Sequence, residues 1–372
     1  MRYILSGGGT GGHIYPALAI ISEIKKRNKD AEILYVGKKG SLEEELVTKE
    51  GIKFSPIEVK GLPRKKINKD TVVTLMALLK GLRQCEKIIK EFKPDVVIGT
   101  GGYVCAPILL KAQQKKILTV IQEQNAYPGK TNRILSKKAD LVAVNFEEAK
   151  KYLKYKKMIV TGNPIRDDFN HVDREKARKS LGIKDKEKFV LSFGGSGGQE
   201  STNEAIIGIL KGEYKRDFKL YHVTGKDHYQ GFMKAIDGID LENVNIVDYS
   251  NNVPELIMAS DLVIASSSAM TLAEISAVGV ANILIPKAYT AGNHQVYNAN
   301  SYKDKKASYV ILEEDLNSDM LYNNIEDILK DNKKREEMAN NVLKLGNKNA
   351  VKNLVDGIEL LINERTESKR KI

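Results

Sequence analysis

The hydrophobic positions of the chain fall in short apolar runs that alternate with longer amphipathic stretches. Each run ends in glycine, asparagine or a polar turn, and the stretch after it, roughly ten to eighteen residues, has helical spacing. Such alternation predicts β-α-β units with parallel sheets. In chain order the predicted strands cover residues 3–5, 33–36, 96–98, 118–121 and 141–144, then 189–192, 220–223, 244–247, 262–265 and 281–285.

The pattern starts again near the middle of the chain, because the strands at 3–5 and 189–192 are both followed by a glycine loop and a helix. We therefore predict an α/β fold with two Rossmann-like domains, residues 1–162 and 163–345. A helical segment at 346–372 is expected to pack back on the first domain. Ligands of such open sheets bind at the carboxyl ends of the strands, so the main site is expected in the cleft between the two sheets.

The composition describes a globular chain of 372 residues with 42% hydrophobic residues and a formal net charge of +12. Residues 1–163 hold 31 Lys and Arg against 16 Asp and Glu, whereas residues 164–372 hold 29 against 32. The basic half favours an anionic partner, which leaves nucleic acid, a membrane surface and a phosphorylated substrate open. The absence of Trp and the 6% aromatic content weaken the case for single-stranded nucleic acid.

Cysteine content and hydropathy bear on where the protein works. Cys85 and Cys105 are the two cysteines, too few for a disulfide framework or a cysteine zinc site, and they fit a reducing compartment. The start of the chain lacks the apolar stretch of a signal peptide, and no run approaches the roughly 18 apolar residues of a spanning helix. We expect a protein that is neither secreted nor transmembrane.

Glycine loops follow several predicted strands. Gly7, Gly9 and Gly12 formally satisfy a dinucleotide-binding pattern, but the second strand runs into Gly37, Lys38 and Lys39 where an acidic ribose ligand should stand. An anion-binding loop of another kind is therefore favoured. Similar loops with hydroxyl or basic groups follow at Gly99 to Val104, Gly162 to Arg166, Gly194 to Gly198 and Ser266 to Thr271, and the amides of Gln122 to Asn125 could bond sugar hydroxyls. Helix capping would explain each serine singly, although not the loops as a set.

The five histidines show no metal-ligand spacing, so we predict no metal site. His13 lies at the rim of the first glycine loop. A neutral imidazole there could take a proton from an attacking hydroxyl. It could equally cap the helix or bond a substrate phosphate, and the residues alone leave these roles open.

Residues 60–93 combine ten Lys and Arg, including Arg64, Lys65, Lys66 and Arg83, with many interleaved apolar residues. A basic amphipathic helix is typical of binding to an anionic membrane surface. The alternative is a core helix with a solvated cationic back. The apolar side of this stretch is wider than a stripe that only faces a core needs to be, which favours binding to a membrane surface.

The motifs together resemble the MurG family, the bacterial peptidoglycan glycosyltransferases that make lipid II. They occur in order over almost the whole chain: Gly8 to His13, Gly101 to Val104 with Pro107, Glu123 to Asn125, Gly162 to Arg166, Gly194 to Ser196, Thr271 to Glu274, and Asn293 to Gln295 with Asn298 and Ala299. The resemblance implies a GT-B fold and transfer, with inversion, of N-acetylglucosamine from its UDP donor to the muramoyl 4-hydroxyl of lipid I, the undecaprenyl-diphosphate-linked muramoyl pentapeptide.

The resemblance also implies roles for single residues. His13 would be the base. The acceptor diphosphate would lie against Gly8, Gly9, Gly101, Gly102 and Tyr103. The donor would be bound by Thr10, Gly11, Gly12, Asn125, Arg166, Ser196, Ser250, Ala269, Met270, Thr271, Glu274 and Gln295. Helix N-termini and loop N–H groups can stabilise the UDP leaving group, so no metal ion or cofactor is expected. The basic charge then fits an anionic membrane and predicts a peripheral protein on the cytoplasmic face, with no nucleic acid partner.

The sequence departs from the family pattern at four positions. Gln122 stands where the family usually has His, Ser266 and Ser268 where it has Arg and Gly, and Gln199 where it has Ala. Three other functions stay open. One is a GT-B transferase acting on another lipid acceptor, one is a UDP-N-acetylglucosamine epimerase, and one is a non-catalytic basic protein that binds nucleic acid or membrane.

Overall fold

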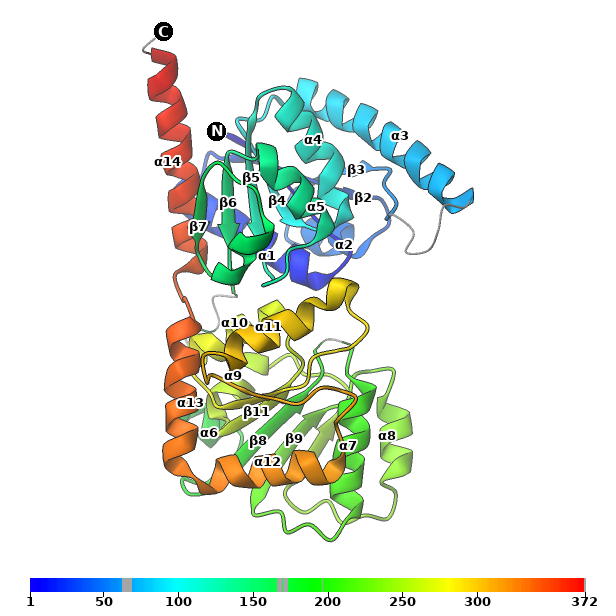
Figure 1. The fold of residues 1–372 in the computed structure, drawn as a ribbon. Coiled ribbons are helices and arrows are strands. Elements are labelled where there is room, and N and C mark those ends of the chain that lie inside the picture. Colours follow the sequence, from blue (N-terminus) through cyan, green and yellow to red (C-terminus); the bar gives the residue numbers. More distant parts are fainter. Residues whose placement is uncertain (62–68, 166–168, 170–172, 196, 371–372) are drawn as a thin grey trace. The chain divides into compact units, whose positions relative to one another are not determined.

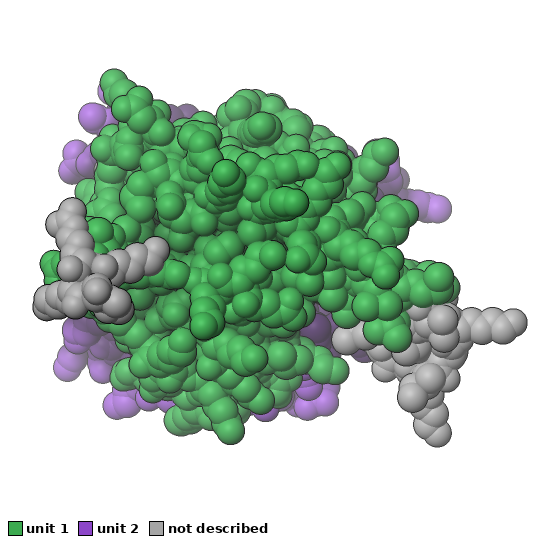
Figure 2. All heavy atoms as spheres, turned by 90° about the horizontal axis from the view of Figure 1, so that it is seen from above, with its two compact units in different colours: residues 1–166, 349–372 green, residues 167–348 purple. Residues whose placement is uncertain are grey.

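The computed structural model describes residues 1–61, 69–165, 169, 173–195 and 197–370. The chain divides into two compact units, which Figure 2 shows in different colours. Unit 1 is formed by Met1–Arg166 and Asn349–Ile372, and unit 2 by Asp167–Lys348. Arg64, Lys65, Lys66, Arg166 and Ser196 lie outside the described residues.

Unit 1 is built on a sheet of seven parallel strands in the order β3-β2-β1-β4-β5-β6-β7. The first, second and fourth strands are almost wholly buried because helices cover both faces of the sheet, which is why they are continuous apolar runs in the sequence. The strands are β1 (Arg2–Gly7), β2 (Glu32–Lys38), β3 (Lys53–Ile57), β4 (Val96–Gly101), β5 (Leu118–Glu123), β6 (Leu141–Val144) and β7 (Met158–Val160).

The helices of unit 1 form one layer on each face of this sheet (Figure 1). Alternate side chains of β1 show the division: Leu5 packs with α1, α2 and α14, and Ile4 packs with α3, α4 and α5. The helices are α1 (Gly11–Arg27), α2 (Leu42–Lys49), α3 (Lys69–Phe92), α4 (Ala106–Gln114), α5 (Lys130–Leu135) and α14 (Ala350–Arg370), with 3₁₀ turns at Tyr103–Cys105, Ser136–Lys138 and Glu147–Tyr152.

Helix α14 comes from the end of the chain and belongs to unit 1. Leu354, Val355 and Ile358 lie in the same hydrophobic cluster as the buried face of α1. At the rim of this contact the Arg27 guanidinium pairs with Asp356 at 2.6 Å and with Glu359 at 3.0 Å. The apolar contact therefore carries most of the stabilisation, because both acidic partners are exposed.

Unit 2 repeats the design with six parallel strands in the order β10-β9-β8-β11-β12-β13. Its core includes buried side chains of α7, α8 and α12 packed on the sheet. The strands are β8 (Lys188–Phe193), β9 (Phe218–Val223), β10 (Val244–Val247), β11 (Leu262–Ala265), β12 (Asn282–Leu284) and β13 (Tyr309–Val310). The helices are α6 (Arg174–Ser180), α7 (Glu200–Lys211), α8 (Tyr229–Ala235), α9 (Val253–Ala259), α10 (Ala269–Val278), α11 (His294–Lys303), α12 (Ser318–Lys330) and α13 (Asn332–Leu345), with a 3₁₀ turn at Ala291–Asn293.

The predicted α/β class with two Rossmann-like sheets is confirmed, and all ten predicted strands are present. Three strands were not predicted: β3, β7 and β13. All three lie at a sheet edge, where fewer apolar residues are needed, and β3 contains Pro56, which a central strand would not tolerate. The basic stretch at 60–93 forms α3 over Lys69–Phe92. Among the described residues, none of the helices combines the length and apolarity needed to cross a bilayer.

Candidate active site

The strand order of each unit reverses next to its first strand, between β1 and β4 in unit 1 and between β8 and β11 in unit 2. Chain segments leave such neighbouring strands in opposite directions, which opens a crevice at their carboxyl ends where ligands of this fold bind. The glycine loops found in the sequence lie at these two points. Each unit is described in turn.

In unit 1, His13 lies in the first turn of α1, beside the loop after β1. Its Nδ1 is 3.1 Å from the carbonyl oxygen of Gly8 and 3.3 Å from the Thr10 hydroxyl. A carbonyl oxygen can only accept, so the contact with Gly8 favours the tautomer in which Nδ1 carries the proton. Nε2 then carries the lone pair, as a general base requires.

Glycine is required where the loop after β4 meets His13. A side chain at Gly101 would lie 2.6 Å from Cδ2 of the imidazole, and one at Gly102 would lie 2.3 Å from the Gly8 carbonyl oxygen. Gly102 also has a φ of 79°, which other residues adopt only with strain. A side chain added at Gly9 would lie 3.7 Å from the ring of Tyr103. The structure therefore brings the predicted residues His13, Gly8, Gly9, Gly101, Gly102 and Tyr103 together.

A buried carboxylate, which the sequence analysis missed, lies under the first glycine loop. Glu43 of α2 is 1% exposed, and its Oε2 accepts a hydrogen bond from the Gly9 N–H at 3.3 Å. Its Oε1 accepts one from the Lys38 N–H at 3.2 Å. The Gly9 N–H is thus already used within the protein, and Glu43 holds the loop in place. A cluster of three glutamates at 43–45 hides this residue in the sequence, because only the fold shows which of them faces inward.

The amides after β5 are largely committed to one another. The Gln122 side chain donates to Asn163 Oδ1 at 2.9 Å, and the Gln124 side chain donates to Gln122 and to the Thr100 carbonyl. Both glutamines are buried. The hypothesis that this run binds sugar hydroxyls therefore does not hold for these two residues, whose donors stabilise the ends of β4 and β5. The bond from Gln122 to Asn163 also gives Gln122 a structural role, because it links β5 to the turn at Asn163.

Glu123 and Asn125 complete this group. Burial raises the pKa of the Glu123 carboxyl, although hydrogen bonds from Asn125, Asn132 and the Gly129 N–H oppose the shift. The Asn125 N–H lies 2.9 Å from Glu123 Oε1, so the carboxyl fixes the backbone at Asn125. Asn125 itself is half-buried, at the carboxyl end of β5. Of the four residues in this run, Asn125 is the one that is not buried, and its side-chain amide also donates to Glu123 Oε1 at 3.3 Å.

In unit 2, the loop after β11 leads into α10, whose N-cap is Ser268. The Ser268 hydroxyl accepts from the Thr271 N–H at 3.3 Å and donates to the Thr271 hydroxyl at 2.8 Å, so capping accounts for this serine. Ala269, Met270 and Thr271 form the first turn of the helix, where the positive end of the helix dipole favours an anion. Glu274 lies one turn further along α10.

Gln295, near the start of α11, joins this group through the backbone. The Ser267 hydroxyl donates to the Gln295 carbonyl at 2.8 Å, and the Gln295 side-chain oxygen accepts from the Lys287 N–H at 3.0 Å. The loop after β8 lies close by, since a side chain at Gly195 would come within 3.5 Å of the Ser266 hydroxyl. The structure thus brings together the loops after β8, β11 and β12. Ser250 follows β10, at the edge of the sheet, and its hydroxyl accepts from the Asn252 N–H at 3.2 Å.

Comparison with known proteins places the chain in a class. Residues 3–144 match the glycosyltransferase family 28 N-terminal domain, and residues 189–356 match the C-terminal domain of the same family. The crystal structure of MurG from Acinetobacter baumannii has a TM-score of 0.78 at 24% identity and covers 96% of this chain and 99% of that one. A UDP-N-acetylglucosamine 2-epimerase from Neisseria meningitidis has a TM-score of 0.66 at 15% identity, covering 96% and 99%. The fold is GT-B, and the class is that of the family 28 glycosyltransferases.

A relative at higher identity narrows this class. The UDP-N-acetylglucosamine–N-acetylmuramyl-(pentapeptide) pyrophosphoryl-undecaprenol N-acetylglucosamine transferase of Finegoldia magna is 45% identical over 368 residues, which cover 98% of this chain and 99% of the relative. The chain belongs to the MurG family of these transferases. The family resemblance inferred from the motifs is confirmed.

Proposed function

We propose that the protein transfers N-acetylglucosamine from UDP-N-acetylglucosamine to the muramoyl 4-hydroxyl of lipid I and so forms lipid II. The observation that carries this proposal is the 45% identity to a named transferase of this activity over nearly the full length of both chains. The geometry at His13 supports it, because the Gly8 carbonyl favours an imidazole with its lone pair on Nε2.

The proposed reaction is a single displacement at the anomeric carbon of the donor sugar. His13 Nε2 takes the proton of the acceptor hydroxyl as its oxygen attacks. The bond from the anomeric carbon to the diphosphate oxygen breaks, UDP leaves with the electron pair, and the configuration inverts. The acceptor diphosphate is assigned to the loops at Gly8 to Gly12 and Gly101 to Tyr103. Since the Gly9 N–H already bonds Glu43, the N-terminal turn of α1 is the better part of the first loop for this task.

The donor is assigned mainly to unit 2. The first turn of α10, at Ala269 to Thr271, would stabilise the developing charge on the UDP diphosphate, and its N–H groups are already oriented before the bond breaks. Glu274 is assigned to the ribose, main-chain groups at Ser250 to the uracil and Gln295 to the donor sugar. The other residues proposed to bind the donor are Thr10, Gly11, Gly12, Asn125, Arg166 and Ser196.

A transfer assay with three parallel arms tests the function. Purified protein is given labelled UDP-N-acetylglucosamine with a lipid I analogue, with diacylglycerol, or with no lipid. We expect labelled product in the lipid I arm alone. Transfer to diacylglycerol would assign a different acceptor, and conversion of the donor sugar without any lipid would identify an epimerase.

A second part of the proposal is peripheral binding to the cytoplasmic face of the cell membrane through α3. Four apolar side chains near the start of this helix, Val73, Leu75, Met76 and Leu79, are each at least half exposed. Such a cluster of exposed apolar groups is uncommon on a surface that meets only water. The cationic side chains beside it are partly neutralised, since Lys80 pairs with Glu58 at 2.5 Å. Apolar insertion is therefore expected to contribute alongside attraction to anionic lipid.

Sedimentation with liposomes tests the membrane proposal. We expect binding to vesicles that contain anionic lipid, weaker binding to neutral vesicles and a decline with added salt. A double variant, Leu75→Ser with Met76→Ser, should lose most of the binding. Leu360→Ser is the matched control, because Leu360 is similarly exposed on α14. Equal binding by the double variant and the control would reject α3 as the docking surface.

A further inference from the structure

A half-buried carboxylate in unit 2 connects the segments that follow three strands, β8, β12 and β13. Glu313 follows β13, and its Oε1 accepts hydrogen bonds from the Gln199 side-chain amide at 2.7 Å and from the Ser201 hydroxyl at 2.6 Å. Its Oε2 accepts from the Ala288 N–H at 2.6 Å. Gln199 and Ser201 begin α7 after the glycine loop, and Ala288 lies in the segment after β12. The carboxylate therefore reaches across two intervening strands, β11 and β12.

Gln199 is the central link of this group. It is 4% exposed, and its side-chain amide donates to the Ile285 carbonyl at 3.2 Å as well as to Glu313. Gln199 also directly follows Gly198, the last residue of the glycine loop. The resemblance described above places Ala at this position in the family, and an Ala side chain could make neither bond. The departure at Gln199 thus gives this chain a polar connection that the usual residue lacks.

Lys287 holds the same loop from a second direction. Its Nζ donates to the Gly198 carbonyl at 2.6 Å, while its backbone N–H donates to the side-chain oxygen of Gln295. Gly198 packs closely against the backbone of Thr224, because a side chain there would come within 2.0 Å of the Thr224 carbonyl oxygen. One residue therefore connects the end of the glycine loop with the residue assigned to the donor sugar.

The electrostatics of the group favour a charged Glu313. Burial acts to raise the pKa of this carboxyl, but the hydrogen bonds from Ser201, Ala288 and Gln199, with the nearby Lys287 ammonium, outweigh it and lower the pKa. Burial lowers the pKa of Lys287, and Glu313 partly offsets that shift. The Glu313 carboxylate, with three donors and a cation nearby, has its oxygens satisfied, which gives it a defined position.

We propose that Glu313 is a positioning residue of the donor site, which acts through Gln199 and Lys287 to hold the loop after β8 and the segment carrying Gln295 in a fixed geometry before UDP-N-acetylglucosamine binds. The inference rests on the proposed function of these loops in donor binding. Preorganised loops spare a ligand the entropic cost of ordering them. Loss of Glu313 should therefore weaken binding of the donor and leave binding of the acceptor unchanged.

The test compares Glu313→Ala and Glu313→Gln with the wild type in the dissociation constant for UDP-N-acetylglucosamine, measured by calorimetry, and in KM for each substrate. We expect Glu313→Ala to weaken donor binding by about tenfold, the scale of one charge-assisted hydrogen bond. Glu313→Gln should weaken it less, because the amide keeps one accepting oxygen. Glu314→Ala, at the exposed neighbouring position, is the matched control and should bind as the wild type does.

Two further readouts separate positioning from general stability. Thermal unfolding checks that each variant is folded, and a merely structural role predicts fewer active molecules with unchanged donor affinity and KM, which would overturn the proposal. In the Gln199→Ala and Glu313→Ala double variant, the loss should be close to that of Glu313→Ala alone, since both act through one bond. Fully additive losses would reject the link through Gln199. If the wild type binds donor but does not transfer sugar to lipid I, the proposed function fails while this test stands.

Discussion

The two units share the order of six strands and place a glycine loop after the first strand, yet the carboxylate found near that loop makes different bonds in each unit. In unit 1, Glu43 bonds directly to a loop N–H at Gly9. In unit 2, Glu313 bonds to the side chains of Gln199 and Ser201, beyond the loop, and to a neighbouring segment. The fold thus supplies the position of a site, while side chains from other elements decide which backbone groups remain for a ligand.

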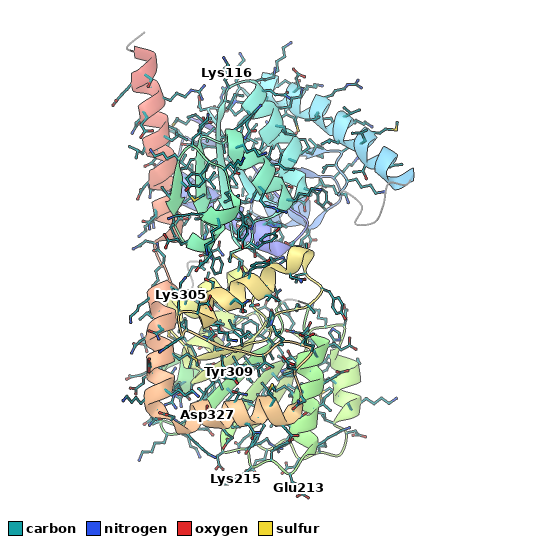
Figure 3. All side chains as sticks on the ribbon, in the orientation of Figure 1. Lys116, Glu213, Lys215, Lys305, Tyr309 and Asp327 are labelled. Atoms are coloured by element: carbon teal, nitrogen blue, oxygen red, sulfur yellow. The ribbon has the colours of Figure 1, made fainter. Side chains whose placement is uncertain are left out.

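The units also differ in charge. Residues 1–163 carry almost twice as many basic as acidic residues, and residues 164–372 are slightly acidic. At the surface of unit 2, Glu213 and Lys215 extend away from the body of the unit (Figure 3), and Lys215 pairs with Asp217 at 2.7 Å. All of these groups are exposed, so such pairs contribute little to stability. In unit 2 the charges of consequence are the half-buried ones near the strand ends.

The largest expected effect tests the role of unit 1 in the chemistry. His13→Ala should lower turnover by about a hundredfold or more, because a general base is lost, while UDP affinity stays nearly unchanged. Steady-state kinetics and calorimetry with UDP measure the two quantities. His13→Asn is the control, since its amide can still donate to the Gly8 carbonyl without acting as a base. A parallel loss of UDP affinity would make His13 a binding residue, and restored turnover in His13→Asn would exclude the base.

The next effect concerns the dependence of unit 1 on the end of the chain. Leu354 of α14 is fully buried beside α1, so Leu354→Ala should lower the free energy of unfolding by about 2–5 kcal/mol. Hydrogen exchange should show the loss in β1 and β6, with β8 protected as before. Leu360→Ala, on an exposed part of the same helix, should change stability by less than about 0.5 kcal/mol. Equal loss of protection in both units would contradict this division.

A smaller loss of stability is expected when a glycine is replaced in either glycine loop. Gly102→Ala should cost about 1–3 kcal/mol of stability, because its backbone has positive φ and the added carbon would meet the Gly8 carbonyl. Gly198→Ala in unit 2 should behave alike. Gly129→Ala is the control, since its φ of −59° suits any residue and the added carbon meets no atom within 4 Å. Chemical denaturation measures all three, and a Gly102→Ala protein as stable as Gly129→Ala would contradict the crowding described for this loop.

The last prediction is a difference between the two units in how their stability responds to pH, and the change expected for each pH unit is small. Burial lowers the pKa of His222 in unit 2 to about 3, whereas burial raises the pKa of Glu123 in unit 1. The unfolded chain binds a proton at His222 first, so unit 2 should lose up to about 1.4 kcal/mol per pH unit as the pH falls from about 6.5 toward 3. Glu123 has the opposite sign, because its contribution is present at low pH and is lost as the pH rises.

Hydrogen exchange between pH 7 and pH 4, corrected for the intrinsic exchange rate, distinguishes the two units. As the pH falls, protection should decline in β9, which carries His222, whereas Glu123 should cause no such decline in β5. His222→Gln should remove the early loss in β9, because the replacement does not titrate. A variant that keeps the same acid response would assign the response to other groups.

The central strands of both sheets could be predicted because they are buried on both faces and must be apolar along their whole length. Of the edge strands, β10 was predicted and β3, β7 and β13 were not, since β7 and β13 are short and partly exposed and so lack a distinctive pattern. The glycine loops could also be predicted, because a backbone that packs closely against its neighbours requires glycine, and glycine is read directly from the sequence. Glu313 was missed for a related reason, as it follows the unpredicted strand β13. Lys287 directly follows a predicted strand and a proline, and it could have been found by the same rule that identified the serine and glycine loops.

The sequence by itself determined the fold class, the loops that form each site and the family, because these depend on local patterns and on motifs in a fixed order. Only the tertiary structure decided how single polar side chains are used. It turned Gln122 and Gln124 inward, chose Glu43 among three neighbouring glutamates and joined Glu313 to Gln199 across more than a hundred residues of chain. The physical reason is that a hydrogen bond is made in space, and residues distant in sequence acquire partners only when the strands that carry them are laid side by side.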